Sequence, residues 1–238
     1  MTIPTPATPT ILSPRVRPLL DELFVDATAA DAPIMARLQE LDPAERDALL
    51  RDYRRLYAAA KDAYLAVSPA VGVFLYTQAR ACRATRIVEF GTSFGLSTIY
   101  LAAALRDSGG GLLISSEMDA DKAARAQENL ARAGLDDLVE IRVGDALDSL
   151  RELPEDIGLL YLDGAKTLYR DVLTLCEPRL RAGALIIADN IDMVALVASY
   201  TDYVRNPAHG YLSSRVVLGD GLEVSLRLAA SAAAPARP

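Results

Sequence analysis

Hydrophobic residues in the central chain occur in short runs that alternate with longer amphipathic stretches. Five runs of apolar, strand-forming residues occupy positions 87–90, 112–116, 139–143, 157–162 and 184–188. Stretches with helical spacing of apolar positions follow them at 97–105, 120–133, 168–180 and 193–204. Runs of four to six residues favour strands, whereas apolar positions recurring every three or four residues favour helices. Two last runs, 213–218 and 222–228, flank a glycine-rich turn and predict an antiparallel hairpin.

This alternation predicts an α/β fold of Rossmann-like, doubly wound type. Strands joined by helices run parallel, and helices cover both faces of the sheet. We therefore expect a mostly parallel seven-stranded sheet with an antiparallel C-terminal hairpin. In such sheets, ligands bind at the carboxyl ends of the strands.

The chain before the first strand is predicted to be helical. Residues 1–14 carry four prolines and are expected to form a mobile arm. Residues 15–66 form an N-terminal extension with helices near 19–24 and 35–41 and a long one opened by Asp42, Pro43 and Glu45. The apolar side of this long helix includes Tyr53 and Tyr57. Residues 67–72 read as a loop before a helix at 73–82. Residues 67–228 form the main domain, and 229–238 a loose tail.

Composition narrows the classes of partner. The 238 residues carry a net charge of −7, which argues against binding nucleic acid or an anionic membrane surface. No signal peptide and no apolar run of transmembrane length is visible, and Cys82 and Cys176 lack metal-ligand spacing. We expect a cytoplasmic enzyme that acts on a small molecule. The N-terminal helices either cover its active site or pair two subunits, and we expect a homodimer.

The first strand ends in a glycine turn suited to a nucleotide-like ligand. The sequence Glu89-Phe90-Gly91-Thr92-Ser93-Phe94-Gly95-Leu96-Ser97 joins a strand to a helix. Glycine permits the sharp turn and the close approach of a ligand. Two glycines rather than the three of G-x-G-x-x-G argue against a dinucleotide, and Glu89 favours a cationic ligand over a phosphate. E-x-G-x-x-x-G is the form of this turn in methyltransferases that use S-adenosylmethionine (SAM).

Acidic residues follow the other strands. Glu117 follows Gly91 by the interval at which Rossmann folds place the acid that binds ribose hydroxyls, although it could also favour the following helix start. Asp163 follows the fourth strand, and Asp189-Asn190 the fifth. If these strands are neighbours, the side chains converge and would require a cation such as Mg²⁺, Mn²⁺ or Ca²⁺. The same acids could instead cap helices. Lys166 would face this site as a base or remain solvated.

From residue 67 to residue 190 the chain resembles the metal-dependent class I O-methyltransferases of the catechol and caffeoyl-CoA type. The matching segments keep the family's order and spacing over about two thirds of the chain, which is more specific than any single motif. They are Val67-Ser68-Pro69-Ala70-Val71-Gly72, the glycine turn, Glu117, Gly144-Asp145-Ala146, Leu162-Asp163-Gly164-Ala165-Lys166, Tyr169, Gly183 and Ala188-Asp189-Asn190, with Gly219-Asp220-Gly221-Leu222-Glu223 extending the match.

This resemblance implies roles for individual residues. The implied SAM-binding residues are Val67, Glu89, Gly91, Thr92, Ser97, Glu117, Asp145, Ala146 and Asp163. Asp163, Asp189 and Asn190 are implied to bind Mg²⁺ or a similar ion, and Asp163 and Lys166 to be catalytic, with Lys166 taking the proton of the accepting hydroxyl. The implied reaction transfers a methyl group from SAM to a catechol-like or other vicinal-hydroxyl aromatic.

Two departures from the family pattern concern the acceptor. Ala165 stands where catechol-type members have a bulky aromatic, and Ser214 stands where they have a glutamate that contacts the second hydroxyl. Both weaken the case for simple catechol. The alternatives are a tRNA-modifying methyltransferase, a SAM-binding protein without catalysis and a nicotinamide oxidoreductase. His209, the single histidine, is expected in a solvated turn, with a position beside the acceptor as the alternative.

Overall fold

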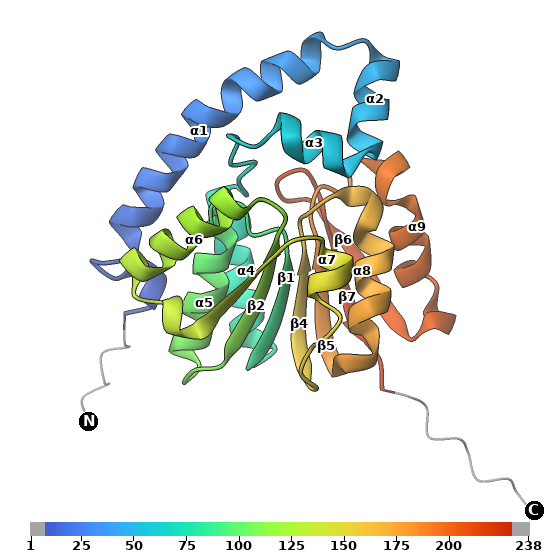
Figure 1. Cartoon of the computed structure of the whole chain (residues 1–238). Coiled ribbons are helices and arrows are strands. Elements are labelled where there is room, and N and C mark those ends of the chain that lie inside the picture. The colour runs from blue at the N-terminus through green and yellow to red at the C-terminus, as the bar shows by residue number, and fades with distance from the viewer. Residues whose placement is uncertain (1–7, 230–238) are drawn as a thin grey trace, which may run out of the picture.

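The computed structural model describes residues 8–229, and their seven strands form one sheet (Figure 1). The strands are β1 (Arg86–Phe90), β2 (Leu112–Glu117), β3 (Val139–Val143), β4 (Ile157–Leu162), β5 (Leu180–Ala188), β6 (Tyr211–Val216) and β7 (Leu222–Arg227). They are ordered β3-β2-β1-β4-β5-β7-β6, with β7 antiparallel to both of its neighbours and the other pairs parallel. The predicted fold class is confirmed. β4 and β5 are neighbours, which is the condition under which the side chains that follow them were expected to converge.

The sheet has a hydrophobic layer on each face because its strands are buried from both sides. Ile87 and Leu159 pack into one cluster, while Val88 and Leu160, the next residues along, pack into the other. The first layer is covered by α4 (Pro69–Ala81), α5 (Leu96–Asp107) and α6 (Ala120–Ala133). The second is covered by α7 (Ala146–Ser149), α8 (Tyr169–Cys176) and α9 (Val194–Arg205). This two-sided burial fixes the register of each strand.

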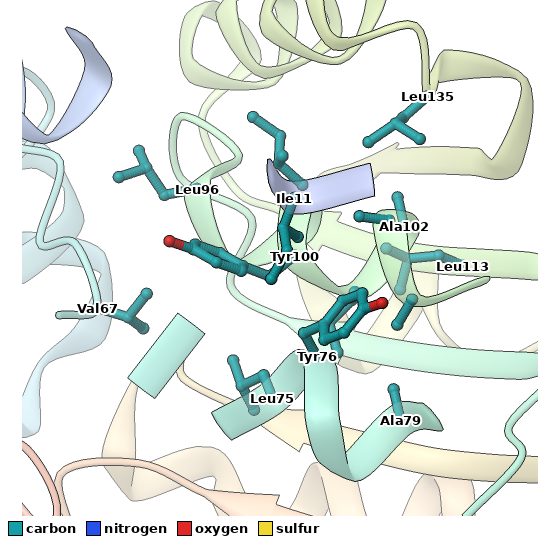
Figure 2. Close-up of a cluster of buried hydrophobic side chains, with 14 of the residues drawn as sticks. Ile11, Val67, Leu75, Tyr76, Ala79, Leu96, Tyr100, Ala102, Leu113 and Leu135 are labelled. Carbon is teal, nitrogen blue, oxygen red and sulfur yellow. The ribbon is translucent and has the colours of Figure 1, made fainter. Parts of the chain in front are cut away.

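Figure 2 shows the first layer where α4 and α5 meet, with Leu75 and Tyr76 near Tyr100 and Ala102. Ile11 reaches the same cluster from the short 3-10 helix Thr10–Leu12. The backbone amide and hydroxyl of Thr10 both donate to Asp107. The described end of the expected mobile arm is therefore packed against α5. Residues 1–7 of that arm and 230–238 of the expected tail lie outside the described residues.

In the N-terminal extension, the helices begin and end at other residues than predicted. The two pieces expected before residue 42 are one helix, α1 (Arg17–Glu40), which continues through Pro33. The expected long helix divides into α2 (Pro43–Arg51) and α3 (Tyr53–Ala59) at Asp52. The side chain of Asp52 accepts a hydrogen bond from the amide of Arg55 and so begins α3 as its N-cap.

These three helices form an arch over the sheet. The buried side chains of α1, which are Leu19, Leu20, Leu23 and Ala27, all lie in its first half, and neither α2 nor α3 has a fully buried residue. Figure 1 shows α1 rising away from the sheet and α3 lying near the ends of the strands. The arch therefore leaves apolar side chains facing inward without dense packing.

Smaller differences concern element ends. The expected loop 67–72 is partly helical, because Ser68 caps α4 by accepting from the Val71 amide. The expected helix 168–180 ends at Cys176, and Leu180 already belongs to β5. None of the helices in residues 8–229 combines the length and the hydropathy needed to cross a membrane.

Candidate active site

The glycine turn brings β1 against the loop that follows β4. Gly91 and Gly95 have φ angles of 103° and 89°, which disfavour residues with side chains. A Cβ on Gly91 would lie 2.8 Å from the Gly164 amide nitrogen and 2.9 Å from the Asp163 carbonyl oxygen. The turn therefore requires glycine for space as well as for conformation.

Glu89 lies in β1, just before this turn, and three hydroxyls hold its side chain. Its carboxylate is fully buried and accepts hydrogen bonds of 2.6–2.7 Å from the hydroxyls of Ser97, Thr98 and Ser115. Burial raises the pKa of Glu89, and the three hydrogen bonds oppose that rise. Glu89 holds Ser97, which lines the adjoining cavity, and the expected contact of Glu89 with a cationic ligand stays a prediction.

A cavity lies between the glycine turn, the end of β2 and the start of α7. Eight of the nine residues predicted to bind SAM line it, Glu89 being the exception. They are Val67, Gly91, Thr92, Ser97, Glu117, Asp145, Ala146 and Asp163. We call this space the donor cavity. Its lining combines the first turn of α5 with carboxylates at or just after the ends of three strands, which suits a ligand having both a polar and a cationic part.

Glu117 and Asp145 both line the donor cavity but have different hydrogen-bond partners. The Glu117 carboxylate accepts from the backbone amides of Ser93 and Asp119 at 2.7 and 2.9 Å, which fixes its orientation. Asp145 caps α7 through the Leu147 amide and also accepts from the Tyr53 hydroxyl and from Arg54. Asp145 thus ties α3 to the cavity rim.

The acids after β4 and β5 converge as predicted from the strand order. The register pairs Leu162 with Ala188, so Asp163 and Asp189 emerge side by side. The hydroxyl of Tyr161 lies 3.2 Å from Oδ2 of Asp163 and 2.9 Å from Oδ2 of Asp189. Both carboxylates are therefore directed at one point.

Asn190 and Lys166 complete this group. The Asn190 backbone, at a φ of 54°, donates to Asp189 over 2.7 Å, and its side-chain Nδ2 donates to Asp220 over 3.2 Å, which orients the amide. The Lys166 ammonium lies 2.9 Å from Oδ1 of Asp163, and both side chains are more than four fifths buried. All four predicted metal and catalytic residues thus lie in one cluster.

The electrostatics of this cluster fit a bound cation. Burial raises the pKa of Asp163, an effect that Lys166 opposes. Burial, and then the neighbouring charge of Asp163, raises the pKa of Asp189 to about 7. One ammonium thus faces two buried carboxylates, and a divalent ion would supply the missing charge. No three His, Cys, Asp or Glu side chains within residues 8–229 are grouped to hold a metal, so such a site depends on the Asn190 amide as its third ligand.

A second cavity of about 380 Å³ adjoins the donor cavity. Lys166, Asn190 and Asp220 line one end of it, and we call it the acceptor cavity. The residues that line both cavities are Tyr57, Leu65, Ala66, Asp163 and Gly164. The two spaces therefore meet beside Asp163. Asp189, which is 4% exposed, lines neither and lies behind Asp163.

The N-terminal extension, whose helices were expected either to cover the active site or to pair two subunits, contributes residues to both cavities. Tyr53 and Tyr57 were expected only as the apolar side of a helix, yet the Tyr57 hydroxyl accepts from the Ala165 amide over 2.8 Å. Asp31 of α1 accepts from the amides of Tyr64 and Leu65, which fixes the segment between the cavities. The pairing of Tyr53 with Tyr57 on one helical face was the available signal. His209 stacks on Tyr203 and lines neither cavity.

Comparison with known proteins gives one consistent result. A family model described as a methyltransferase domain matches residues 88–191. A catechol O-methyltransferase of Niastella koreensis is 40% identical over 151 residues, which cover 62% of this chain and 67% of that protein. A catechol O-methyltransferase of Mycobacterium tuberculosis is 39% identical over 134 residues, which cover 56% of this chain and 60% of that protein. The chain thus matches about two thirds or less of the length of these relatives.

Solved structures agree over more of the chain. The O-methyltransferase TomG of Streptomyces achromogenes, in complex with SAM and involved in tomaymycin synthesis, matches with a TM-score of 0.65 and 25% identity, covering 85% of this chain and 99% of that one. The O-methyltransferase of Bacillus cereus, in complex with S-adenosylhomocysteine, matches with a TM-score of 0.63 and 26% identity, covering 84% and 99%. Both resemble this chain over more than four fifths of its length.

Proposed function

The chain belongs to the class I SAM-dependent O-methyltransferases of the catechol and caffeoyl-CoA type, and from this premise we propose that it methylates a hydroxyl of a small aromatic that carries two adjacent hydroxyls, with the help of a divalent metal ion. The observation that carries the proposal is the junction of the two cavities at Asp163, with Lys166 on the acceptor side. A methyl donor and an acceptor hydroxyl placed in these cavities would meet at that junction, and holding both reactants together accounts for much of such a rate enhancement.

In the donor cavity, the chain's polar groups match the parts of SAM. Glu117 accepts the ribose hydroxyl protons, because its two oxygens are already oriented by backbone amides. Ser97, held by Glu89, lies with Gly91 and Thr92 around the methionine part. Ala146 at the start of α7 lies beside the adenine, and Val67 closes the opposite wall.

Where Asp163 and Asn190 line the acceptor cavity, they would hold Mg²⁺ or a similar ion together with the buried Asp189. When bound, such an ion lowers the pKa of the hydroxyl that contacts it. Lys166 would take the proton from that hydroxyl as a neutral amine, after releasing its own proton to solvent, because its Nζ lines the cavity and Asp163 fixes its position. Tyr161 shares its hydroxyl between the two carboxylates and keeps them directed toward each other.

The acidic lining favours a small molecule over a nucleic acid as acceptor. Asp31, Asp163 and Asp220 line the acceptor cavity, and Lys166 is its single basic residue among those described. A polyanion would meet repulsion there rather than the basic groove that nucleic acids require. The alternative of a tRNA-modifying enzyme therefore gains no support from the site, and the intact cluster around Lys166 favours catalysis over SAM binding alone.

Calorimetry with S-adenosylhomocysteine tests the donor half of the proposal. We expect micromolar or tighter binding and no measurable binding of NAD, because the two-glycine turn and its carboxylates suit a cationic donor. Incubation with SAM, Mg²⁺ and catechol should then yield a monomethylated product by mass spectrometry. Binding of NAD in preference to S-adenosylhomocysteine would contradict the proposal.

A further inference from the structure

The acceptor cavity changes character along its length. At the end beside the donor cavity it is lined by Asp163, Lys166 and Asn190. At the other end it is lined by aliphatic side chains of the arch. These are Ile34, Met35 and Leu38 of α1, Leu50 of α2 and Leu56 of α3. The cavity therefore combines a small polar end with a larger apolar one.

The apolar end faces a space and not a packed core. Neither α2 nor α3 buries a residue fully, and Met35 is 46% exposed. Figure 1 shows the backbone of the arch above the ends of the strands. Aliphatic side chains left against water lose the stabilisation that burial would give them. An apolar ligand in this space would restore it.

The volume of the acceptor cavity also exceeds that of one dihydroxylated ring bound at its polar end. Cavities of roughly 300–1,000 Å³ accommodate ligands of drug-like size, and the acceptor cavity measures about 380 Å³. The residue before Lys166 is Ala165, whose small side chain leaves this space open beside the polar end. One dihydroxylated ring at Lys166 would leave the arch side empty.

We infer that the acceptor carries an uncharged apolar extension, alkyl or aryl, on the far side of its dihydroxylated ring, and that the arch formed by α1, α2 and α3 binds this extension. The inference rests on the proposed function and names the substrate class more closely. The ring occupies the end beside Lys166, and the extension lies among Leu38, Leu50 and Leu56.

The charges around the cavity distinguish this extension from a charged one. Besides the carboxylate at the polar end, Asp31 and Asp220 also line the cavity, so an anionic extension is disfavoured. Asp31 already accepts from the amides of Tyr64 and Leu65, at 2.6 and 3.0 Å, so its charge is directed at the backbone rather than into the apolar end. A cationic extension would lose hydration among the leucines without gaining a free carboxylate there.

A series of 4-alkylcatechols tests the inference directly. Initial rates of SAM-dependent methylation in the presence of Mg²⁺ would be measured for catechol and its 4-methyl, 4-butyl and 4-hexyl derivatives. We expect kcat/KM to rise about two- to fourfold per added methylene until the cavity is filled, since full burial of one methylene is worth up to about fourfold. Catechols with a propanoate or an aminoethyl group at the same position should fall below the butyl derivative.

Two adjacent leucines of α2 provide a matched pair of variants. Leu50 lines the acceptor cavity, whereas Leu49 does not and lines an adjoining cavity that shares Ile34, Leu38 and Ala59 with it. Both are half-buried. Leu50→Gln should reduce the ratio of kcat/KM for 4-hexylcatechol to that for catechol by roughly tenfold, the loss expected for a lost apolar contact in a binding pocket. Leu49→Gln should leave this ratio unchanged.

The outcomes separate the inference from the proposed function. Methylation of catechol with no gain along the alkyl series would overturn the inference and leave the proposed function in place. So would a preference for the propanoate or aminoethyl compound, or equal losses of the ratio in Leu49→Gln and Leu50→Gln. Absence of methylation for every catechol, despite binding of S-adenosylhomocysteine, would overturn the proposed function and the inference with it.

Discussion

Replacement of Lys166 by methionine should lower kcat for catechol methylation by roughly 10²–10⁴-fold, the usual contribution of a positioned general base. Lys166 lines the acceptor cavity but not the donor cavity, so the affinity for S-adenosylhomocysteine should change by less than about threefold. The two measurements together distinguish loss of the base from loss of the donor site.

The variant Lys166→Arg tests whether Lys166 acts as a base or only through its positive charge. Arginine keeps the positive charge beside Asp163 but stays protonated, so it should lose nearly as much activity as methionine. The exposed Lys61 offers a matched control, because Lys61→Met removes a lysine outside both cavities and should leave kcat unchanged. Recovery of near-normal turnover by Lys166→Arg would contradict the base role and assign Lys166 an electrostatic one.

Asp189→Asn should have opposite effects on activity and on stability. Asparagine can keep its oxygen toward the Asn190 amide and its NH₂ group toward the Tyr161 hydroxyl, which can then donate to Asp163. The fold should therefore persist while the candidate ion loses one of its two carboxylates. We expect the Mg²⁺-dependent rate to fall roughly 10²–10⁴-fold, because the transition state loses several kcal/mol of stabilisation.

The stability effect follows from the pKa of Asp189. In the metal-free protein this pKa is raised from 3.8 to about 7 by burial and then by Asp163. Because this carboxyl binds its proton more tightly in the folded than in the unfolded protein, its contribution to the free energy of unfolding is full below about pH 4. That contribution is lost as the pH rises through 7. Asparagine does not titrate, so in EDTA the variant should gain stability relative to wild type between pH 4 and pH 8, on the order of 1–4 kcal/mol.

Urea unfolding at both pH values measures this gain. The exposed Asp192, which pairs with Arg215, supplies the control, since Asp192→Asn removes an acid that is half exposed. It should change neither the pH dependence nor the activity appreciably. A variant Asp189→Asn that loses stability equally at pH 4 and pH 8 would mean that the aspartate is not strained by burial in the metal-free protein.

Sequence pattern was sufficient for the parts of the fold and site that depend on strand order. Once β4 lies beside β5, the side chains that follow the two strands converge, as Asp163 and Asp189 do at Tyr161. The glycine turn was equally readable, because Gly91 combines a positive φ with contact to the backbone of Gly164. In both cases the local sequence motif and the order of the strands place the residues at the same end of the sheet.

Side-chain direction was less accessible. Glu89 was expected to contact a ligand because it precedes the turn, whereas the pattern did not predict the three hydroxyls that hold its carboxylate, including that of Ser115 on the neighbouring strand. Tyr57 was expected in a helical core because its apolar neighbours have that spacing, whereas its hydroxyl reaches Ala165 across 108 positions of the chain. The break at Asp52 likewise reflects one capping contact within a helical pattern. Each of these three features depends on a contact with a distant residue or on a local cap, and the spacing of apolar residues predicts neither.

The central claim is that Asp163, Asp189 and Asn190 hold a divalent ion on which methyl transfer depends. The most direct test is the initial rate of catechol methylation by protein treated with EDTA, followed by titration with Mg²⁺. We predict a loss of at least about 100-fold in EDTA, full recovery with excess Mg²⁺, and unchanged binding of S-adenosylhomocysteine throughout. A rate that is the same with and without the chelator would contradict the account.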